Sequence, residues 1–153
     1  MPTVMNVARY VLEKCGSVTV MKLQKLVYYC QAWSLAWDDE PLFDEDFEAW
    51  ANGPVCPELY ETHKGQFRVE PDLLPANPEK LFTKDQIESM DAVLKYYGDK
   101  SPHWLSELTH KEDPWKIARG NCPSGAWCKN VISKESMRDY YEGLIAIAWE
   151  EEE

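Results

Sequence analysis

The segment TVMKLQKLVYYCQAWSLAW, residues 19–37, decides the fold because it predicts a long helix that is apolar around most of its circumference. Thr19 suits the N-terminal cap, since its hydroxyl can accept a hydrogen bond from a free N–H of the first turn. A helix of this kind is buried at the centre of a domain. Lys22 and Lys25 would then mark its solvent-facing side. Apolar residues repeat at helical spacing on one face and flank it on both sides; they are Leu23, Leu26, Val27, Cys30, Trp33, Ser34 and Trp37, flanked by Val20, Met21, Tyr28 and Leu35.

Shorter helices are predicted on both sides of this central helix, from apolar periodicity with capping residues. An Asn52-Gly53-Pro54 turn signal predicts a small hairpin or short strand at 46–51. A strand near 66–70 and a loop or strand at 121–132 complete the β structure. The other helices are expected at 3–15, 57–64, 83–98, 101–108, 113–120 and 133–148.

The expected fold class is therefore mainly α with minor β (α+β minor). We expect a single compact helical domain, residues 1–153, of about six to seven helices with a small β-hairpin or short sheet. An acidic tail at about 149–153 is expected to be solvated.

The net charge of -11 argues against a nucleic-acid-binding protein, which usually carries a basic stripe, and favours a basic protein partner. No signal peptide is recognisable, and no apolar stretch approaches the roughly 18 residues that span a membrane, so we expect a cytoplasmic protein. The cysteine count is 5, and Cys15, Cys30 and Cys56 lie among apolar neighbours. This pattern favours buried free thiols over a disulfide scaffold.

The segment LTHKEDPW, residues 108–115, raises the question of catalysis because it gathers a histidine and two carboxylates. In an enzyme, His110 would be a general base oriented by Glu112 or Asp113. The same segment can instead join two helices, and we favour this interpretation because its capping chemistry is complete and no recognisable nucleophile lies nearby. We therefore expect no catalytic residue and no cofactor. In this interpretation Leu108 ends the first helix, and Thr109 or His110 covers its free carbonyl groups. Asp113 caps the second helix, Pro114 occupies its first turn, and Trp115 packs on the core.

A metal site is weakly indicated. Cys122 and Cys128 have five residues between them, which is wider than the roughly two to four typical of zinc sites. The three histidines, His63, His103 and His110, follow no regular spacing. We therefore expect no metal ligands and regard the two cysteines as loop thiols, exposed or half-buried.

The segment AWANGPVCPELY, residues 49–60, demands a defined backbone path at its Asn-Gly-Pro turn. Gly53 can adopt a positive φ angle, but the proline that follows favours extended geometry, so the turn type stays open. Two interpretations are equally supported. The turn is either a structural feature clamped by Trp50 and Tyr60, or a binding surface.

Residues 21–65 resemble the core of the Panacea domain, the SocA-like antitoxin family of bacteria and prophages. The resemblance extends over about residues 3–145 and fits the stand-alone form. The motifs that carry it are Lys22-Leu23-Gln24-Lys25-Leu26 with Tyr28, Pro41-Leu42-Phe43, Glu48-Ala49-Trp50, Gly53-Pro54-Val55 with Pro57 and Tyr60, Leu105-Ser106-Glu107-Leu108-Thr109-His110, and Pro114-Trp115.

The resemblance implies a non-catalytic antitoxin of a type II-like toxin–antitoxin system, which binds a cognate, basic toxin encoded next to it. The alternative is a proteolytic adaptor that delivers its partner to a AAA+ protease. Neither role requires nucleic acid or a membrane, and a homo-oligomer is compatible with both. We expect the partner-binding surface to include Trp50, Asn52, Gly53, Pro54, Tyr60, His110, Asp113 and Trp115.

Overall fold

The computed structural model describes the backbone of residues 1–152 and the side chains of residues 1–148, so the expected acidic tail lies outside the described side chains. Over the described residues, the chain is mainly helical with minor β structure, as predicted. The helices are α1 (Val4–Cys15), α2 (Val20–Asp38), α3 (Pro57–His63), α4 (Lys84–Tyr97), α5 (Pro102–Lys111), α6 (Asp113–Arg119) and α7 (Lys134–Glu152). The strands are β1 (Val18–Thr19), β2 (Phe47–Trp50), β3 (Gly53–Val55), β4 (Arg68–Val69) and β5 (Val131–Ile132), and a short 3-10 helix spans Pro71–Leu73.

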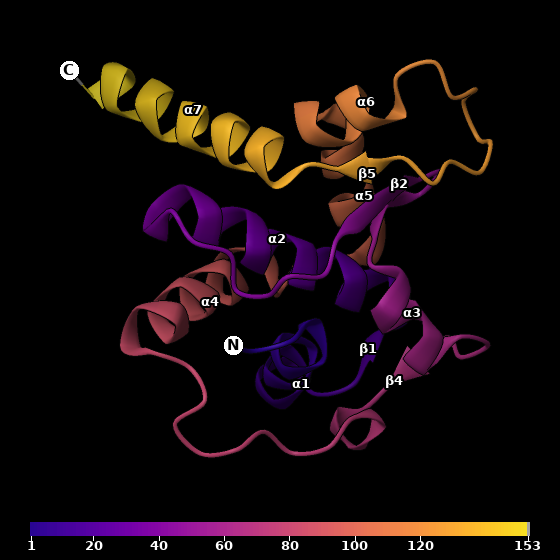
Figure 1. Cartoon of the computed structure of the whole chain (residues 1–153), viewed down its shortest axis with the longest axis vertical. Helices are drawn as coiled ribbons and strands as arrows, with labels where there is room; N and C mark the ends of the chain where they lie inside the picture. Colours follow the sequence, from indigo (N-terminus) through magenta and orange to yellow (C-terminus); the bar gives the residue numbers. More distant parts are fainter. Residues whose placement is uncertain (153) are drawn as a thin grey trace.

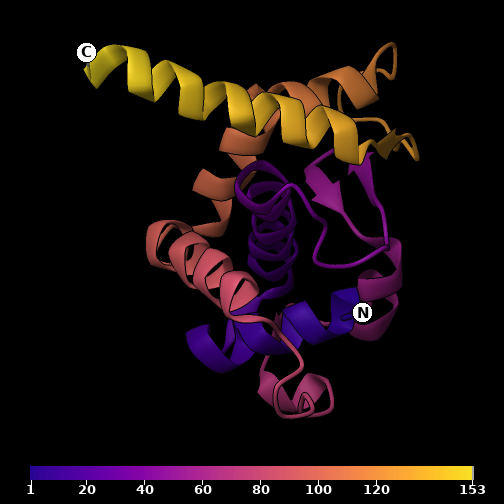
Figure 2. The same ribbon diagram turned by 60° about the vertical axis from the view of Figure 1, so that its left-hand side comes forward.

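Helix α2 is the central element, as predicted. It lies between α7 on one side and α1 and α4 on the other (Figures 1 and 2). Every residue from Leu23 to Ala32 is buried, so the helix has almost no solvent-facing side in its middle turns. The expectation that Lys25 faces solvent is therefore wrong, because only 1% of this residue is exposed. Trp37, expected on the apolar face, is 44% exposed near the end of the helix.

The helix starts follow the local capping signals of the sequence. The Thr19 hydroxyl accepts a hydrogen bond from Lys22 N at 3.1 Å. Thr83 and Gln86 form a reciprocal capping box at the start of α4, in which each side chain accepts from the other's backbone N–H. These local hydrogen bonds explain why the helix starts were predictable.

Two small antiparallel sheets cover one end of the helical core. Strands β2 and β3 form the predicted hairpin, with Glu48 opposite Val55 and Trp50 opposite Gly53. Strand β5 pairs with the other edge of β2 and gives a sheet of order β3-β2-β5. Strand β4 lies in the region predicted near 66–70 and pairs with β1. The hairpin projects toward α5 and α6, as Figure 1 shows.

The junction between α5 and α6 differs from the expectation. Helix α5 continues past Leu108 to Lys111, and the capping position of α6 is Glu112 instead of Asp113. Glu112 has extended backbone angles, and its side chain makes no capping hydrogen bond. Pro114 occupies the first turn of α6, as predicted.

The cysteines divide into two groups. Cys15, Cys30 and Cys56 are free thiols, as expected. Cys122 and Cys128 were expected to be unpaired loop thiols, and this is wrong, because they form a disulfide and Cys128 is only 3% exposed. Among the described helices, none is long and apolar enough to cross a membrane.

Candidate functional site

The turn between β2 and β3 is held by side chains that donate hydrogen bonds to its backbone carbonyl oxygens. The donors come from α2, α5 and α6, which are distant from the turn in sequence. We call these donor side chains the hairpin clamp. The pairs are Arg119 Nη1 with Ala49 O (3.2 Å), Trp115 Nε1 with Trp50 O (2.8 Å), His110 Nε2 with Ala51 O (2.7 Å), Ser106 Oγ with Asn52 O (2.7 Å), Lys25 Nζ with Pro54 O (3.2 Å) and Gln24 Nε2 with Cys56 O (3.4 Å).

The hairpin clamp supplies hydrogen-bond donors to carbonyl groups of the turn. A tight turn leaves carbonyl groups that the strands cannot pair, and buried carbonyl groups need hydrogen-bond donors. Gln24 also accepts from Cys56 N at 2.9 Å, so one amide side chain satisfies both backbone groups of that residue. The turn is thereby fixed against the helical core.

Gly53 allows the hairpin to approach α2 closely. Its φ angle is +118°, and a Cβ atom at this position would lie 2.5 Å from Lys25 Cε and 2.9 Å from Thr109 Oγ1. The backbone angle therefore favours glycine here, and an added Cβ atom would force the end of the Lys25 side chain and the Thr109 hydroxyl to shift. Gly53 and Pro54, two of the predicted partner-binding residues, are buried in the turn.

Lys25 is an unusual member of the clamp, because it is a buried amine that faces a carbonyl oxygen. Burial lowers the pKa of Lys25 to about 7. The pKa of His63 is also lowered, mainly by burial and in part by the charge of Lys25. His63 Nε2 lies 2.9 Å from Gln24 Nε2. Because an amide nitrogen can only donate, His63 accepts here and carries its proton on Nδ1.

His110 is engaged by the turn. A carbonyl oxygen can only accept, so His110 Nε2 must donate its proton to Ala51 O. The ring also meets Trp115 edge to face, with 4.3 Å between ring centroids. Neither predicted carboxylate partner contacts it: Asp113 Oδ1 lies 3.5 Å from Lys116 Nζ, and Glu112 faces other residues. The arrangement of a general base oriented by a carboxylate is therefore not formed at His110.

The outer side of the hairpin carries an aromatic hollow of about 380 Å³. Trp50, Tyr60 and Trp127 form its walls, and the rings of Trp50 and Tyr60 lie 5.0 Å apart. Lys25 and His63 line its inner wall. The hollow therefore combines apolar rings with a few buried polar groups, the composition typical of binding pockets.

The predicted partner-binding residues are only partly gathered at this hollow. Trp50, Asn52 and Tyr60 line it. His110 and Trp115 line a neighbouring hollow of about 290 Å³, together with Arg119 and Lys116. Asp113 lines neither, and its side chain is 57% exposed at the start of α6.

Sequence reasoning missed Trp127, which is 64% exposed and lies in the loop closed by the Cys122–Cys128 disulfide. Arg119 anchors this loop by donating to Pro123 O (2.5 Å) and Ala126 O (2.8 Å). The only signal in the sequence is an aromatic residue between two cysteines in the segment CPSGAWC, residues 122–128. Among the described residues, no cluster of His, Cys, Asp and Glu could hold a metal ion.

The fold and the clamp define a helical domain built around α2, with a hairpin fixed against it. Comparison with known families agrees with the resemblance in the sequence. The family model described as antitoxin SocA-like, Panacea domain, matches residues 23–116, which is most of the chain. The protein therefore belongs to the SocA-like Panacea domain family. The match includes every clamp residue except Arg119. No curated protein and no solved structure matches the chain.

Proposed function

We propose that this protein is an antitoxin of a type II-like system, which neutralises a protein toxin by binding it directly. The membership of the SocA-like antitoxin family carries the proposal. The net charge of -11 supports a basic toxin, because opposite charges accelerate association. The toxin would be the product of a neighbouring bacterial or prophage gene, and both proteins would act in the cytoplasm.

The hairpin surface is our candidate for the toxin contact. Exposed tryptophan and tyrosine side chains contribute strongly to protein interfaces, because they bury large areas and lose little conformational entropy. Around the preformed hollow, Trp127 is exposed, and Trp50 and Tyr60 are partly exposed. The proposed contact surface would also include Asn52 in this hollow, His110 and Trp115 in the neighbouring hollow, and the exposed Asp113 at the start of α6.

Co-expression with the neighbouring gene tests the proposal. We expect that gene to arrest growth when expressed alone and to be harmless beside the wild-type protein, with a complex that survives purification. A neighbouring product that is harmless alone, or that stays toxic beside this protein, would refute the proposed function.

A matched pair of variants tests the hairpin surface. Trp127 is 64% exposed and Phe67 is 78% exposed, and Phe67 lies outside the hollow. We expect Trp127→Ala to weaken toxin binding by roughly tenfold or more, as truncation of an interface tryptophan does. Phe67→Ala should bind as the wild type does. Equal affinity of both variants would place the contact elsewhere and leave the antitoxin function itself intact.

A second cavity favours the adaptor as the alternative function. It is lined by Trp33, Trp37 and Trp104, toward the opposite end of α2 from the hairpin hollow. An adaptor must hold its partner and a AAA+ protease at once, and two separate cavities could serve two proteins. The adaptor requires that the toxin is degraded faster when this protein is present. An unchanged toxin half-life would exclude the adaptor and leave direct inhibition.

A further inference from the structure

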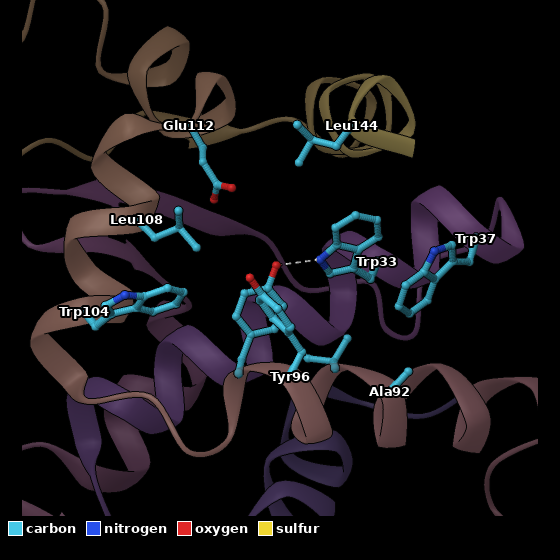
Figure 3. Close-up of a pocket in the computed structure, with 10 residues that line it drawn as sticks. Trp33, Trp37, Ala92, Tyr96, Trp104, Leu108, Glu112 and Leu144 are labelled. Atoms are coloured by element: carbon cyan, nitrogen blue, oxygen red, sulfur yellow. Dashed lines mark hydrogen bonds between the residues drawn. The ribbon is translucent and has the colours of Figure 1, made fainter. Parts of the chain in front are cut away.

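The cavity at the C-terminal part of α2 is aromatic and contains one carboxylate. Its volume is about 510 Å³, and α2, α4, α5 and α7 contribute to its walls. Figure 3 shows the rings around an open centre, with the carboxylate of Glu112 directed into the space between Leu108 and Trp33. The residues used below are Trp33, Trp37, Tyr96, Trp104 and Glu112.

Glu112 is held so that one of its oxygens is occupied and the other is not. Oε1 accepts from Tyr29 Oη at 2.6 Å and from Tyr141 Oη at 2.9 Å. Oε2 has no hydrogen-bond partner among the described residues, although only 5% of the residue is exposed. Every described side-chain polar atom that is closed off from solvent has a partner. Oε2 must therefore be accessible from the cavity that Glu112 lines.

The aromatic rings at the opening already attract a positive charge. Lys100 Nζ lies 5.5 Å from the ring centre of Tyr96 and 5.2 Å from that of Trp104, within the range of cation–π contacts. Tyr96 is 59% exposed and Trp104 is 39% exposed, so both rings are accessible from outside. Among the described residues, no cationic group forms an ion pair with Glu112 deeper in the cavity.

We propose that this cavity receives an arginine side chain of a protein partner, whose guanidinium stacks against the tryptophan and tyrosine rings and donates to Glu112 Oε2. The inference rests on the proposed function, because it identifies a contact that a basic toxin would make in addition to the one at the hairpin surface. The guanidinium is planar, stacks on aromatic faces and is weakly hydrated, which suits it better than a lysine ammonium to a half-enclosed aromatic site.

The electrostatics of Glu112 agree with a cationic occupant. Burial raises the pKa of this carboxyl group, and the hydrogen bonds from Tyr29 and Tyr141 offset part of the increase. A guanidinium at Oε2 would favour the ionised form and remove the cost of an uncompensated buried charge. An apolar occupant would leave that cost in place, and an anionic occupant would increase it. The net charge of -11 further favours a cationic partner.

The test uses the whole protein and a small probe, N-acetyl-arginine methylamide, with the corresponding citrulline derivative as its neutral control. The indole N–H signals of the tryptophans are followed by NMR during titration. We expect the arginine derivative to shift the signals of Trp33, Trp37 and Trp104 in a saturable way, and the signals of Trp50 and Trp127 to stay in place. Absence of such shifts, or equal shifts with the citrulline derivative, would overturn the inference.

Two variants complete the test. Glu112→Gln keeps an oxygen for the tyrosine hydroxyls and removes the charge, so binding of the arginine derivative should weaken by roughly tenfold. Tyr96→Ala changes an exposed side chain at the opening and should also weaken it, whereas Trp127→Ala should not. Undiminished binding by both of the first two variants would overturn the inference. Because the titration contains no toxin, its failure is distinct from a failure of toxin neutralisation by the wild-type protein.

Discussion

Gly53 and Lys25 are packed against each other so closely that a Cβ atom on Gly53 would lie 2.5 Å from Lys25 Cε. The two residues belong to different elements, the hairpin and the central helix, and Lys25 also donates to the carbonyl of the residue after Gly53 at 3.2 Å. The absence of a side chain at one position therefore allows the buried amine at the other to reach the turn. This contact therefore holds the hairpin turn against the central helix.

Gly53→Ala should destabilise the fold for two reasons, the positive φ angle and the lack of space. Gly65 offers a control, because its φ angle is also positive, +85°, but nothing lies within 4 Å of an added Cβ atom. We expect Gly65→Ala to cost about 1–2 kcal/mol from the backbone angle alone. Gly53→Ala should cost about 1–3 kcal/mol more, as overpacking does. Chemical denaturation measures both values, and equal costs would refute the close packing against Lys25.

Lys25 should make stability depend on pH. The pKa of Lys25 falls from 10.5 in an exposed lysine to about 7 in the folded protein. Between these values the unfolded chain binds a proton that the folded chain has lost, so the free energy of unfolding should rise with pH. The contribution is at most about 1.4 kcal/mol per pH unit.

The comparison with Lys25→Met isolates this contribution, and Lys22→Met, on the same helix, is the control. The useful window runs from about pH 7 to about pH 9.0, the ordinary pKa of a thiol. Burial raises the pKa of Cys56 to about 12, so above this window the unfolded chain loses a thiol proton that the folded chain keeps, and the free energy of unfolding falls again. Denaturation across this window should give a smaller slope for Lys25→Met than for the wild type and the control. Parallel curves for all three proteins would mean that Lys25 titrates as an exposed lysine.

The features that could be predicted from sequence are those set by local chemistry. Thr83 and Gln86 lie within one helical turn of each other, so their capping box could be predicted from this short segment alone. The Asn52-Gly53-Pro54 signal located the hairpin for the same reason. The extent of α2 and its central position followed from its apolar circumference, because only burial can cover it.

The features that could not be predicted depend on partners distant in sequence. Lys25 was placed on the solvent-facing side because charged residues are almost never fully buried without a partner, and here the partner is a carbonyl 29 positions away. Glu112 appeared to be a neighbour of His110, yet the hydroxyl groups that bind it belong to Tyr29 in α2 and Tyr141 in α7. Helical periodicity does not show which helix faces pack against each other, so neither of these hydrogen-bonded pairings could be predicted.

His110→Ala should weaken the hairpin and not abolish a reaction. The variant removes the donor to Ala51 O and the edge contact with Trp115, so we expect a loss of about 1–3 kcal/mol in the free energy of unfolding. His110→Gln, which keeps a side-chain donor, should recover part of it. His103→Ala is the control, because His103 is exposed on the same helix.

The same variants test for catalysis at His110. Toxin neutralisation should persist in His110→Gln at temperatures where the protein remains folded, weakened at most by the loss of one contact of the proposed toxin surface. Complete loss of function in a folded His110→Gln protein, with an undiminished toxin complex, would support a chemical role for the ring and contradict a purely structural one.

Replacing Glu112 by glutamine should destabilise the fold less than replacing it by alanine. Glutamine retains an oxygen that can accept from Tyr29 and Tyr141, whereas alanine leaves both hydroxyl groups without their acceptor. We expect Glu112→Ala to be less stable than Glu112→Gln by about 1–3 kcal/mol.

The pH dependence of Glu112→Gln has a defined sign. Because burial raises the pKa of Glu112, the folded protein keeps a proton that the unfolded chain releases above its ordinary pKa of 4.5. As pH rises from 4.5 through the raised pKa, Glu112 should therefore lower the free energy of unfolding of the wild-type protein. Glu112→Gln should not show this decrease. Thermal denaturation of both proteins across this range measures the difference. A wild-type advantage that grows with pH would show that the ionised carboxylate is stabilised by the fold, which would contradict a carboxylate left without its counter-charge in the cavity.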